Sequence, residues 1–158
     1  MNDADEWGDN FYTCIVCEKT FRSTLYEIAR GYERTHFFDG EQMPEVETID
    51  SEGIGTYCSA ACLNQDRDKL LVKENVRATF PGIGPIEVCS RCGRPVDMAQ
   101  FHLSWTEEEF NCQWGQFIDV LQPIYYQSLA VVCQQCAPLS TTAIQEESSS
   151  SNLADVVT

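Results

Sequence analysis

The sequence has few basic residues and none near either end. Its 158 residues contain 10 Lys and Arg against 25 Asp and Glu, a formal net charge of −15 at pH 7. All of the basic residues lie between Lys19 and Arg94. Proteins that bind nucleic acid neutralise phosphates with Lys and Arg and usually have a basic domain. The composition therefore argues against nucleic acid as the main partner.

Long apolar runs are also missing. No stretch approaches the ~18 apolar residues that a transmembrane helix requires. Residues 1–10 are acidic and lack the basic and apolar regions of a secretory signal. We therefore expect no membrane association and a cytoplasmic or otherwise intracellular, reducing location. In such a compartment, nine cysteines indicate metal ligands rather than disulfides.

Eight of the nine cysteines form four closely spaced pairs. The gap between the first pair and the second is as long as the gap between the third and the fourth. The offset from Cys14 to Cys89 is also the offset from Cys58 to Cys133. This spacing predicts a tandem repeat of one zinc module, and chance recurrence is the alternative. The pairs are Cys14 and Cys17, Cys58 and Cys62, Cys89 and Cys92, and Cys133 and Cys136.

Two such pairs supply the four thiolates of a tetrahedral zinc site. With four thiolates on the ion no position is open for water or substrate, so we expect two structural Zn²⁺ ions and no catalysis. Sequential pairing gives each half its own site, because each half then contains all of its ligands; interleaved, cross-braced pairing is the alternative. An iron–sulfur cluster also uses four cysteines and stays open from sequence. The expected ligands are Cys14, Cys17, Cys58 and Cys62 for one ion, and Cys89, Cys92, Cys133 and Cys136 for the other.

The second cysteine pair lies in a recognisable motif. The segment Tyr57-Cys58-Ser59-Ala60-Ala61-Cys62, with Cys14-x-x-Cys17 upstream, resembles the (Phe/Tyr)-Cys-Ser-x-x-Cys signature of treble-clef zinc fingers of the TRASH and MYM type. In that group a cysteine turn supplies two ligands and the start of a helix supplies two. The resemblance implies a treble clef over residues 11–72 with these four cysteines as ligands. Residues 88–94 are similar to a generic zinc knuckle.

The chain divides into five segments by composition. Pro81-Gly82-Ile83-Gly84-Pro85 blocks regular structure and marks the clearest boundary. The predicted segments are an acidic N-terminal stretch (1–10), zinc module one (11–80), a linker (81–85), zinc module two (86–139) and a disordered Ser/Thr-rich tail (140–158). The expected fold class is small, zinc-stabilised α+β, with two tandem treble-clef-like or zinc-ribbon-like modules, each having short strands and a helix.

Local signals predict three helices and one strand. Thr24 and Glu27 fit a capping box for a short helix with an apolar face through Tyr32, and Ser59 is a good N-cap for a helix to about Lys73. Ser104 and Glu107 fit a second capping box. The helix expected there, over residues 104–122, has an apolar stripe and ends before a proline. A short buried strand is expected over residues 129–133. The stripe consists of Phe110, Trp114, Phe117, Ile118 and Leu121.

The remaining reactive side chains have ordinary structural interpretations. Cys112 is predicted to pack against its module, with a reactive or intermolecular thiol as the alternative. His36 and His102 are expected to be surface or packing residues, since each site already has four cysteines. Residues 107–109 are three glutamates that suit a charged helix start better than a catalytic cluster.

These observations favour a non-enzymatic interaction protein. The acidic surface would dock on a basic surface of another protein, and one version is an inhibitor that presents carboxylates in place of nucleic-acid phosphates. The first alternative is a zinc-finger regulator that binds nucleic acid through residues 67–77 together with Arg91 and Arg94. The second is a metal-handling or redox protein with exchangeable thiols. The oligomeric state is open.

Overall fold

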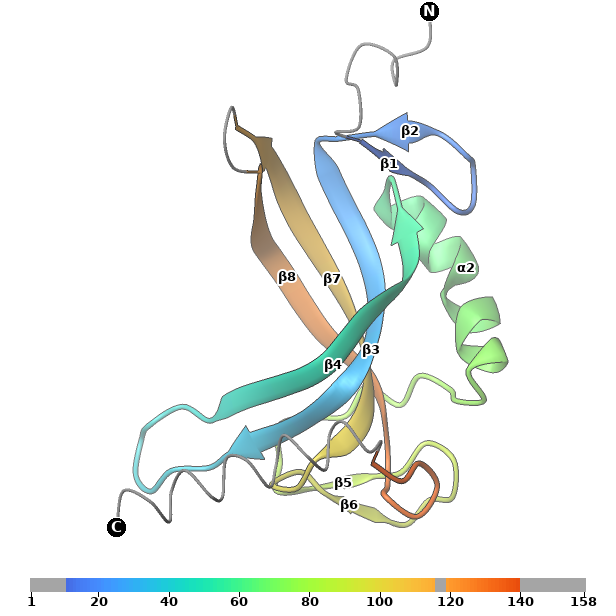
Figure 1. The fold of residues 1–158 in the computed structure, drawn as a ribbon. Coiled ribbons are helices and arrows are strands. Elements are labelled where there is room, and N and C mark those ends of the chain that lie inside the picture. Colours follow the sequence, from blue (N-terminus) through green and yellow to red (C-terminus); the bar gives the residue numbers. More distant parts are fainter. Residues whose placement is uncertain (1–10, 116–118, 140–158) are drawn as a thin grey trace, which may run out of the picture.

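The computed structural model describes residues 11–115 and 119–139 (Figure 1). The elements are β1 (Tyr12–Thr13), β2 (Thr20–Phe21), β3 (Thr24–His36), β4 (Glu45–Tyr57), α2 (Ala60–Lys73), β5 (Ile86–Val88), β6 (Pro95–Asp97), β7 (His102–Trp114) and β8 (Asp119–Val132). The four long strands form one antiparallel sheet in the order β4-β3-β7-β8, and the short strands form two hairpins, β1–β2 and β5–β6. The fold class is therefore small α+β, mostly sheet, with one helix among the described residues.

The helix after the second cysteine pair is confirmed. Helix α2 begins after Ser59, whose side-chain Oγ accepts a hydrogen bond from the Cys62 amide at 3.2 Å, and it ends at Lys73. Ser favours this position because its hydroxyl satisfies an amide that has no partner inside the helix. The segment 81–85 contains no helix or strand. The short strand expected at residues 129–133 is the end of the longer strand β8.

The other two predicted helices are wrong. Residues 24–32 lie in β3, and the described part of residues 104–122 lies in β7 and β8. Module two therefore has no helix among its described residues, contrary to the expected fold class. Hydrogen bonding between distant strands outweighs the local helix signals, and Gly31 in the first segment already disfavours helix by about 1 kcal/mol. Phe117 and Ile118 of the stripe lie outside the described residues, as do the segments 1–10 and 140–158.

The centre of the sheet joins the two halves of the sequence. Strands β3 and β7 pair directly, with Thr24 opposite Asn111 and Glu33 opposite His102. Strands β4 and β8 form the two edges. The turn of each short hairpin donates a backbone hydrogen bond to one of these edges, from Ile15 to the end of β4 and from Ser90 to the end of β8. Part of each sheet edge is thus covered beside a cysteine cluster.

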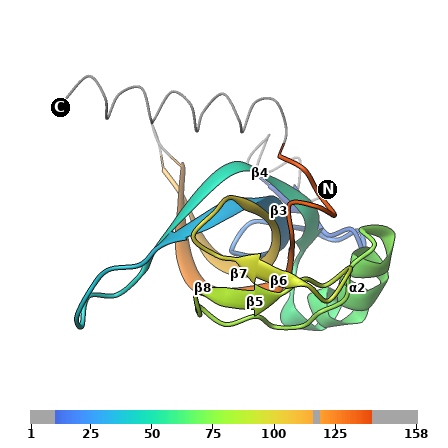
Figure 2. The same ribbon diagram turned by 90° about the horizontal axis from the view of Figure 1, so that it is seen from below.

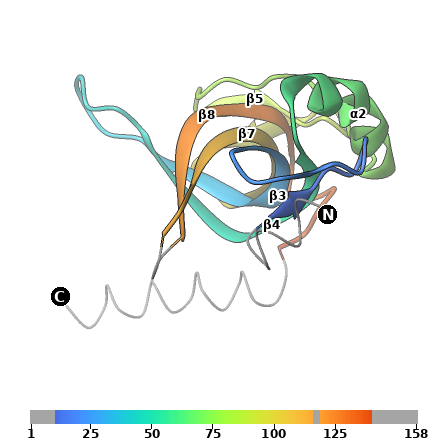
Figure 3. The same ribbon diagram turned by 90° about the horizontal axis from the view of Figure 1, so that it is seen from above.

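The outer face of the sheet packs against α2. Figures 2 and 3 show the sheet curled, with the helix lying outside the curl. Ile28, Tyr57 and Trp105 are almost fully buried together with leucines of the helix. Full burial of a large apolar side chain contributes roughly 1.5–3 kcal/mol, so this layer is a main source of stability besides any bound metal. The Trp105 indole donates to the Glu74 carboxylate at 3.2 Å, which ties the sheet to the end of the helix.

The inner, concave face has two distinct parts. Near β1 and β2 it is apolar, because Leu25 lies opposite Phe110 and the Tyr12 ring contacts the rings of Phe21 and Trp114 at centroid distances of 5.8 Å. Further along the strands the inward positions are mainly small or polar. Side chains alternate between the two faces of a strand. The inward polar set is therefore Glu27, Glu33 and Thr35 of β3, and His102, Ser104, Thr106 and Glu108 of β7.

The two halves of the chain repeat the same order of elements. Each half has a short hairpin holding one cysteine pair, then two long strands, then the second cysteine pair. Matched backbone hydrogen bonds have nearly equal N–O distances. They are Cys14–Lys19 (2.9 Å) with Cys89–Arg94 (2.8 Å), Glu18–Cys14 (2.9 Å) with Gly93–Cys89 (3.0 Å), and Ile15–Thr56 (3.0 Å) with Ser90–Val131 (2.8 Å). No helix in the described part of the chain is long and apolar enough to span a bilayer.

Candidate metal centres

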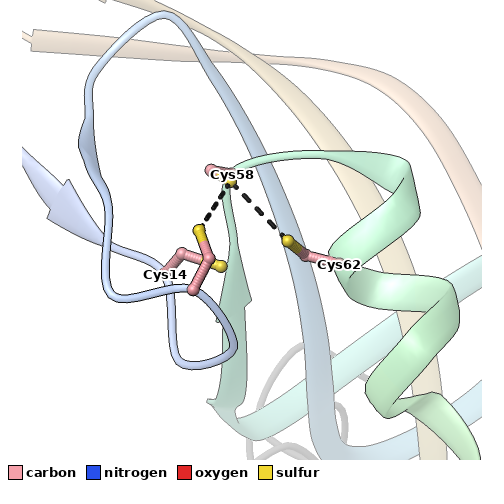
Figure 4. Close-up of side chains that lie close together, drawn as sticks. Cys14, Cys58 and Cys62 are labelled. Atoms are coloured by element: carbon pink, nitrogen blue, oxygen red, sulfur yellow. Dashed lines mark hydrogen bonds between the residues drawn. The ribbon is translucent and has the colours of Figure 1, made fainter.

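The first cluster joins the β1–β2 turn to the start of α2. Cys14 and Cys17 lie in the turn, Cys58 directly follows β4, and Cys62 lies in the first turn of the helix. Figure 4 shows the sulfurs of Cys14, Cys58 and Cys62 directed at one another. All four sulfur atoms lie within 4.8 Å of one another. The Cys17–Cys58 and Cys58–Cys62 sulfur distances are 3.6 and 3.9 Å.

The second cluster joins the β5–β6 turn to the turn that follows β8. Cys89 and Cys92 lie in the first turn, and Cys133 and Cys136 come from the second. The Cys89–Cys136 and Cys92–Cys133 sulfur distances are 3.9 and 3.6 Å. The cysteines therefore group sequentially within each half, and the interleaved arrangement is not the one found.

The sulfur spacing fits one tetrahedral ion in each cluster. Four sulfurs at about 2.3 Å from a zinc ion lie about 3.8 Å apart, close to the distances above. A disulfide would bring two sulfurs to about 2.05 Å, and all nine cysteines are free. In an iron–sulfur cluster the cysteines bind different iron atoms and lie further apart. The two groups thus suit two single metal ions.

Backbone amides stabilise the thiolate form of one cysteine in each cluster. Burial alone would raise the pKa of Cys14, but amide donors at Cys17, Cys58 and Val16 outweigh it and lower the pKa to about 6. Burial has the same opposing effect at Cys89, where amides of Cys133, Cys92 and Arg91 lower the pKa to about 6. Each amide of the second set occupies the position in its half that matches its counterpart in the first. The same arrangement of amide donors around one sulfur therefore occurs in both clusters.

A second sulfur in each cluster resists ionisation. Burial, followed by contacts with the other thiols of its cluster, raises the pKa of Cys58 to about 12. For Cys136 the contact with Cys92 is the main cause, and the pKa again rises to about 12. Several thiolates packed this closely repel one another, and a divalent cation at the centre removes that repulsion. The contrast within each cluster is the electrostatic pattern expected of a metal-binding group.

Cys112 and the two histidines lie outside both clusters. Cys112 is partly buried on β7 beside the hydrophobic core, and burial raises its thiol pKa. That shift opposes the reactivity of a free thiolate. The His36 imidazole contacts the Glu47 carboxylate at 2.9 Å on the surface. His102 is buried in the concave face.

The three consecutive glutamates on β7 do not start a helix, and their side chains separate. The Glu107 carboxylate pairs with Arg67 at 2.7 Å, and Glu109 accepts from the Tyr26 hydroxyl at 3.0 Å. Glu108 points to the opposite, concave face. That face also holds Glu27, which the sequence placed in a predicted helix capping box, and Glu33, for which the sequence predicted no role. Their even spacing would place them on one side of a strand, but residues 24–32 were predicted as helix.

Three of the basic residues proposed for nucleic-acid contact are engaged within the fold. Arg67 binds Glu107 and the Asn64 side chain. The Arg91 guanidinium donates to the backbone carbonyls of Glu74 and Asn75 at the end of α2. Arg94 bonds to the Gln135 side chain. Through these contacts the arginines hold the second cluster and the helix in place.

Comparisons with known proteins leave the clusters as the main guide to function. No family model matches the chain, and neither a curated protein nor a solved structure is significantly similar to it.

Proposed function

We propose that the chain is a non-catalytic, zinc-binding protein-interaction module whose acidic surface docks on a basic surface of a partner protein. The observation that carries this proposal is the composition of the β3–β4 loop and the edge strand β4. Residues 37–57 contain six acidic residues and no Lys or Arg. Among them, five are exposed: Asp39, Glu41, Glu45, Asp50 and Glu52.

The edge position of β4 suits this role. No strand of the described residues pairs with its outer side along most of its length, so a partner strand can add to the sheet there. Arg30 and Arg34, on the neighbouring strand, neutralise Glu52 and Glu47 of this edge. The rest of the edge attracts basic groups and repels a second acidic copy. A partner that presents Lys and Arg fits this surface.

Zinc is the metal that the proposal assigns to both clusters. Four thiolates in a tetrahedral set favour this ion, and with no open position they favour a structural role over catalysis. The first cluster combines a cysteine turn with the start of a helix, which supports a treble clef over residues 11–72. The second combines two turns, which supports a zinc-ribbon-like site. In this proposal the ions supply rigidity, and the acidic edge supplies recognition.

One version of the function is inhibition of a nucleic-acid-binding partner. Carboxylates along an edge strand can occupy a basic channel that normally holds phosphates. Two ions, each held by four thiolates, would bring the folded charge to about −19, which strengthens this attraction at low salt. A direct nucleic-acid-binding role has less support, because Arg67 and Arg91 are engaged in internal contacts.

The test is salt-dependent capture of a partner by the metal-loaded chain. Bait prepared as wild type, as Glu41→Gln/Glu45→Gln, and as the control Glu18→Gln/Asp68→Asn would be exposed to host extract, and retained proteins would then be released with rising salt. We expect release at moderate salt and weaker capture by the first variant alone. If the retained proteins were released at no salt concentration and bound the Glu41→Gln/Glu45→Gln variant as well as wild type, the docking proposal would be overturned. Native mass spectrometry of the same samples should report two zinc ions per chain.

A further inference from the structure

The concave face of the sheet carries acidic side chains that the proposed docking edge does not use. Glu27 lies directly opposite Glu108, and Glu33 lies opposite His102, on the central strands β3 and β7. Like charges placed directly opposite on neighbouring strands destabilise a sheet. The ion pairs of the described residues involve Glu47, Glu52, Glu74 and Glu107, and none involves these three glutamates. No ion pair among the described residues therefore relieves the repulsion between Glu27 and Glu108.

The pKa shifts of Glu27 and Glu108 agree with this geometry. Burial, and after it the charge of Glu108, raises the pKa of Glu27. Burial, followed by the charge of Glu33, raises the pKa of Glu108. A cation placed among these groups would lower the pKa values of both Glu27 and Glu108.

Deeper in the same face lie polar atoms without partners. His102 and Ser104 are each 1% exposed, and neither His102 Nε2 nor Ser104 Oγ has a hydrogen-bond partner among the described residues. His102 Nδ1 lies 2.9 Å from the Gln100 carbonyl oxygen and so must donate to it, which leaves Nε2 as an acceptor when the ring is neutral. Both side chains share the face of Glu33, because they alternate with Leu103 along β7. These buried atoms call for an N–H donor.

The curl of the sheet brings the acidic positions together. The Tyr126 hydroxyl of β8 donates to Glu33 Oε1 of β3 at 2.9 Å, although β7 lies between these strands. Glu33 and Glu108 also occupy matching positions in the two halves, since the same offset relates Cys14 to Cys89. The face therefore has Glu27 and Glu108 toward one end and Glu33 toward the other. Between them the side chains are small, at Ala29, Gly31, Ser104 and Thr106.

The spacing excludes a single small cation as the best occupant. The described residues contain two groups whose ligand atoms lie within 4.8 Å of one another, and both are the cysteine clusters. Along an extended strand, Glu27 and Glu33 are at most about 20 Å apart. A thin ligand with at least two positive groups can reach both ends, whereas one Lys or Arg side chain of a partner carries a single charge.

We propose that the concave face binds a linear aliphatic polyamine. One ammonium group lies between Glu27 and Glu108, another lies at Glu33, and the alkyl chain crosses the small residues between them. N–H donors of the deeper ammonium satisfy Ser104 Oγ and His102 Nε2. The ligand is held by charge-assisted hydrogen bonds. This proposal does not depend on the docking function of β4.

Calorimetric titration of spermidine into the zinc-loaded full chain tests the proposal. We expect saturable binding of about one spermidine per chain. Glu27→Gln/Glu108→Gln should weaken it at least tenfold, whereas Glu41→Gln/Glu45→Gln, with the same charge change on the exposed edge, should weaken it less than twofold. Thermal melts of every variant would confirm folding, and the single variant Glu33→Gln gives an independent measure of the deeper position.

Four outcomes would overturn the proposal. The absence of saturable heat is the first. Equal losses in the two double variants would show diffuse attraction of counterions to an acidic chain. Displacement of spermidine by Mg²⁺ at equal ionic strength would show the same. An Arg-containing peptide that binds through Glu27 and Glu108 where spermidine does not would assign the face to a partner's side chains instead.

Discussion

The two cysteine clusters have the same first half and different second halves. In both, a short hairpin supplies two cysteines, and backbone amides lower the pKa of the first sulfur to about 6. The second pair lies at the start of α2 in cluster one and in a turn after β8 in cluster two. The hairpin and the long strand pair are therefore the repeated unit, while the position of the last ligand tolerates a change of local structure and of spacing.

Removal of the metal should change the stability of the chain more than any of the substitutions that follow. Structural zinc contributes ~10–16 kcal/mol of apparent binding free energy in small domains, so chelation should unfold the chain. Cys14→Ser and Cys89→Ser, at matching positions, should each leave one ion as counted by native mass spectrometry and lower the melting temperature. Cys112→Ser should keep two ions. Retention of both ions by the first two variants would contradict the assignment of ligands.

The hairpin turns provide the next test. Glu18 and Gly93 occupy matching positions with positive φ, 62° and 75°, a conformation that costs a side-chain-bearing residue about 1–2 kcal/mol. Gly93→Ala should therefore reduce the unfolding free energy by about 1 kcal/mol, since no neighbour lies within 4 Å of the added Cβ. Glu18→Gly should increase it by a similar amount. Urea unfolding measures both, and effects of equal sign would break the equivalence of the turns.

The helix start distinguishes cluster one. Ser59→Ala removes the side-chain oxygen that accepts from the Cys62 amide, and N-cap removal costs about 1 kcal/mol. Ser59→Asp keeps an acceptor and serves as the control. Chelator competition should then show weaker metal retention at cluster one alone in the alanine variant. A matching loss at cluster two would indicate a general loss of stability instead.

The smallest predicted effect concerns pH. The pKa values of Glu27 and Glu108 are raised in the folded chain, so folding favours their protonated forms. Stability from this source is present at low pH and is lost as pH rises through the raised values. Without added polyamine, Glu108→Gln should therefore raise the melting temperature at about pH 8 and change it little near pH 5. An equal change at both pH values would point to packing, not charge.

Local chemistry made the clusters and α2 predictable. Cysteine spacing depends only on short-range geometry, and Ser59 caps the helix through a contact within its first turn. Strands β3 and β7 were missed because their sequences imitate helices. Ser104 and Glu107 resemble a capping box, yet Ser104 lies opposite Gly31 and Glu107 opposite Ile28 in the sheet. These partners come from the other half of the chain, so no local signal could reveal them. The acidic concave face was missed for the same reason.

The central pairing of β3 with β7 has a consequence for synthesis of the chain. Cluster one and the β3–β4 strand pair are complete once Cys62 has left the ribosome, but the partner of Thr24 is Asn111. At about 5–20 residues per second, the stretch from Cys62 to Asn111 takes roughly 2.5 to 10 seconds. During that interval one side of β3 has no partner strand. Glu27, Arg30 and Glu33 place charges on the strand, a pattern that discourages nascent chains on one polysome from pairing with each other.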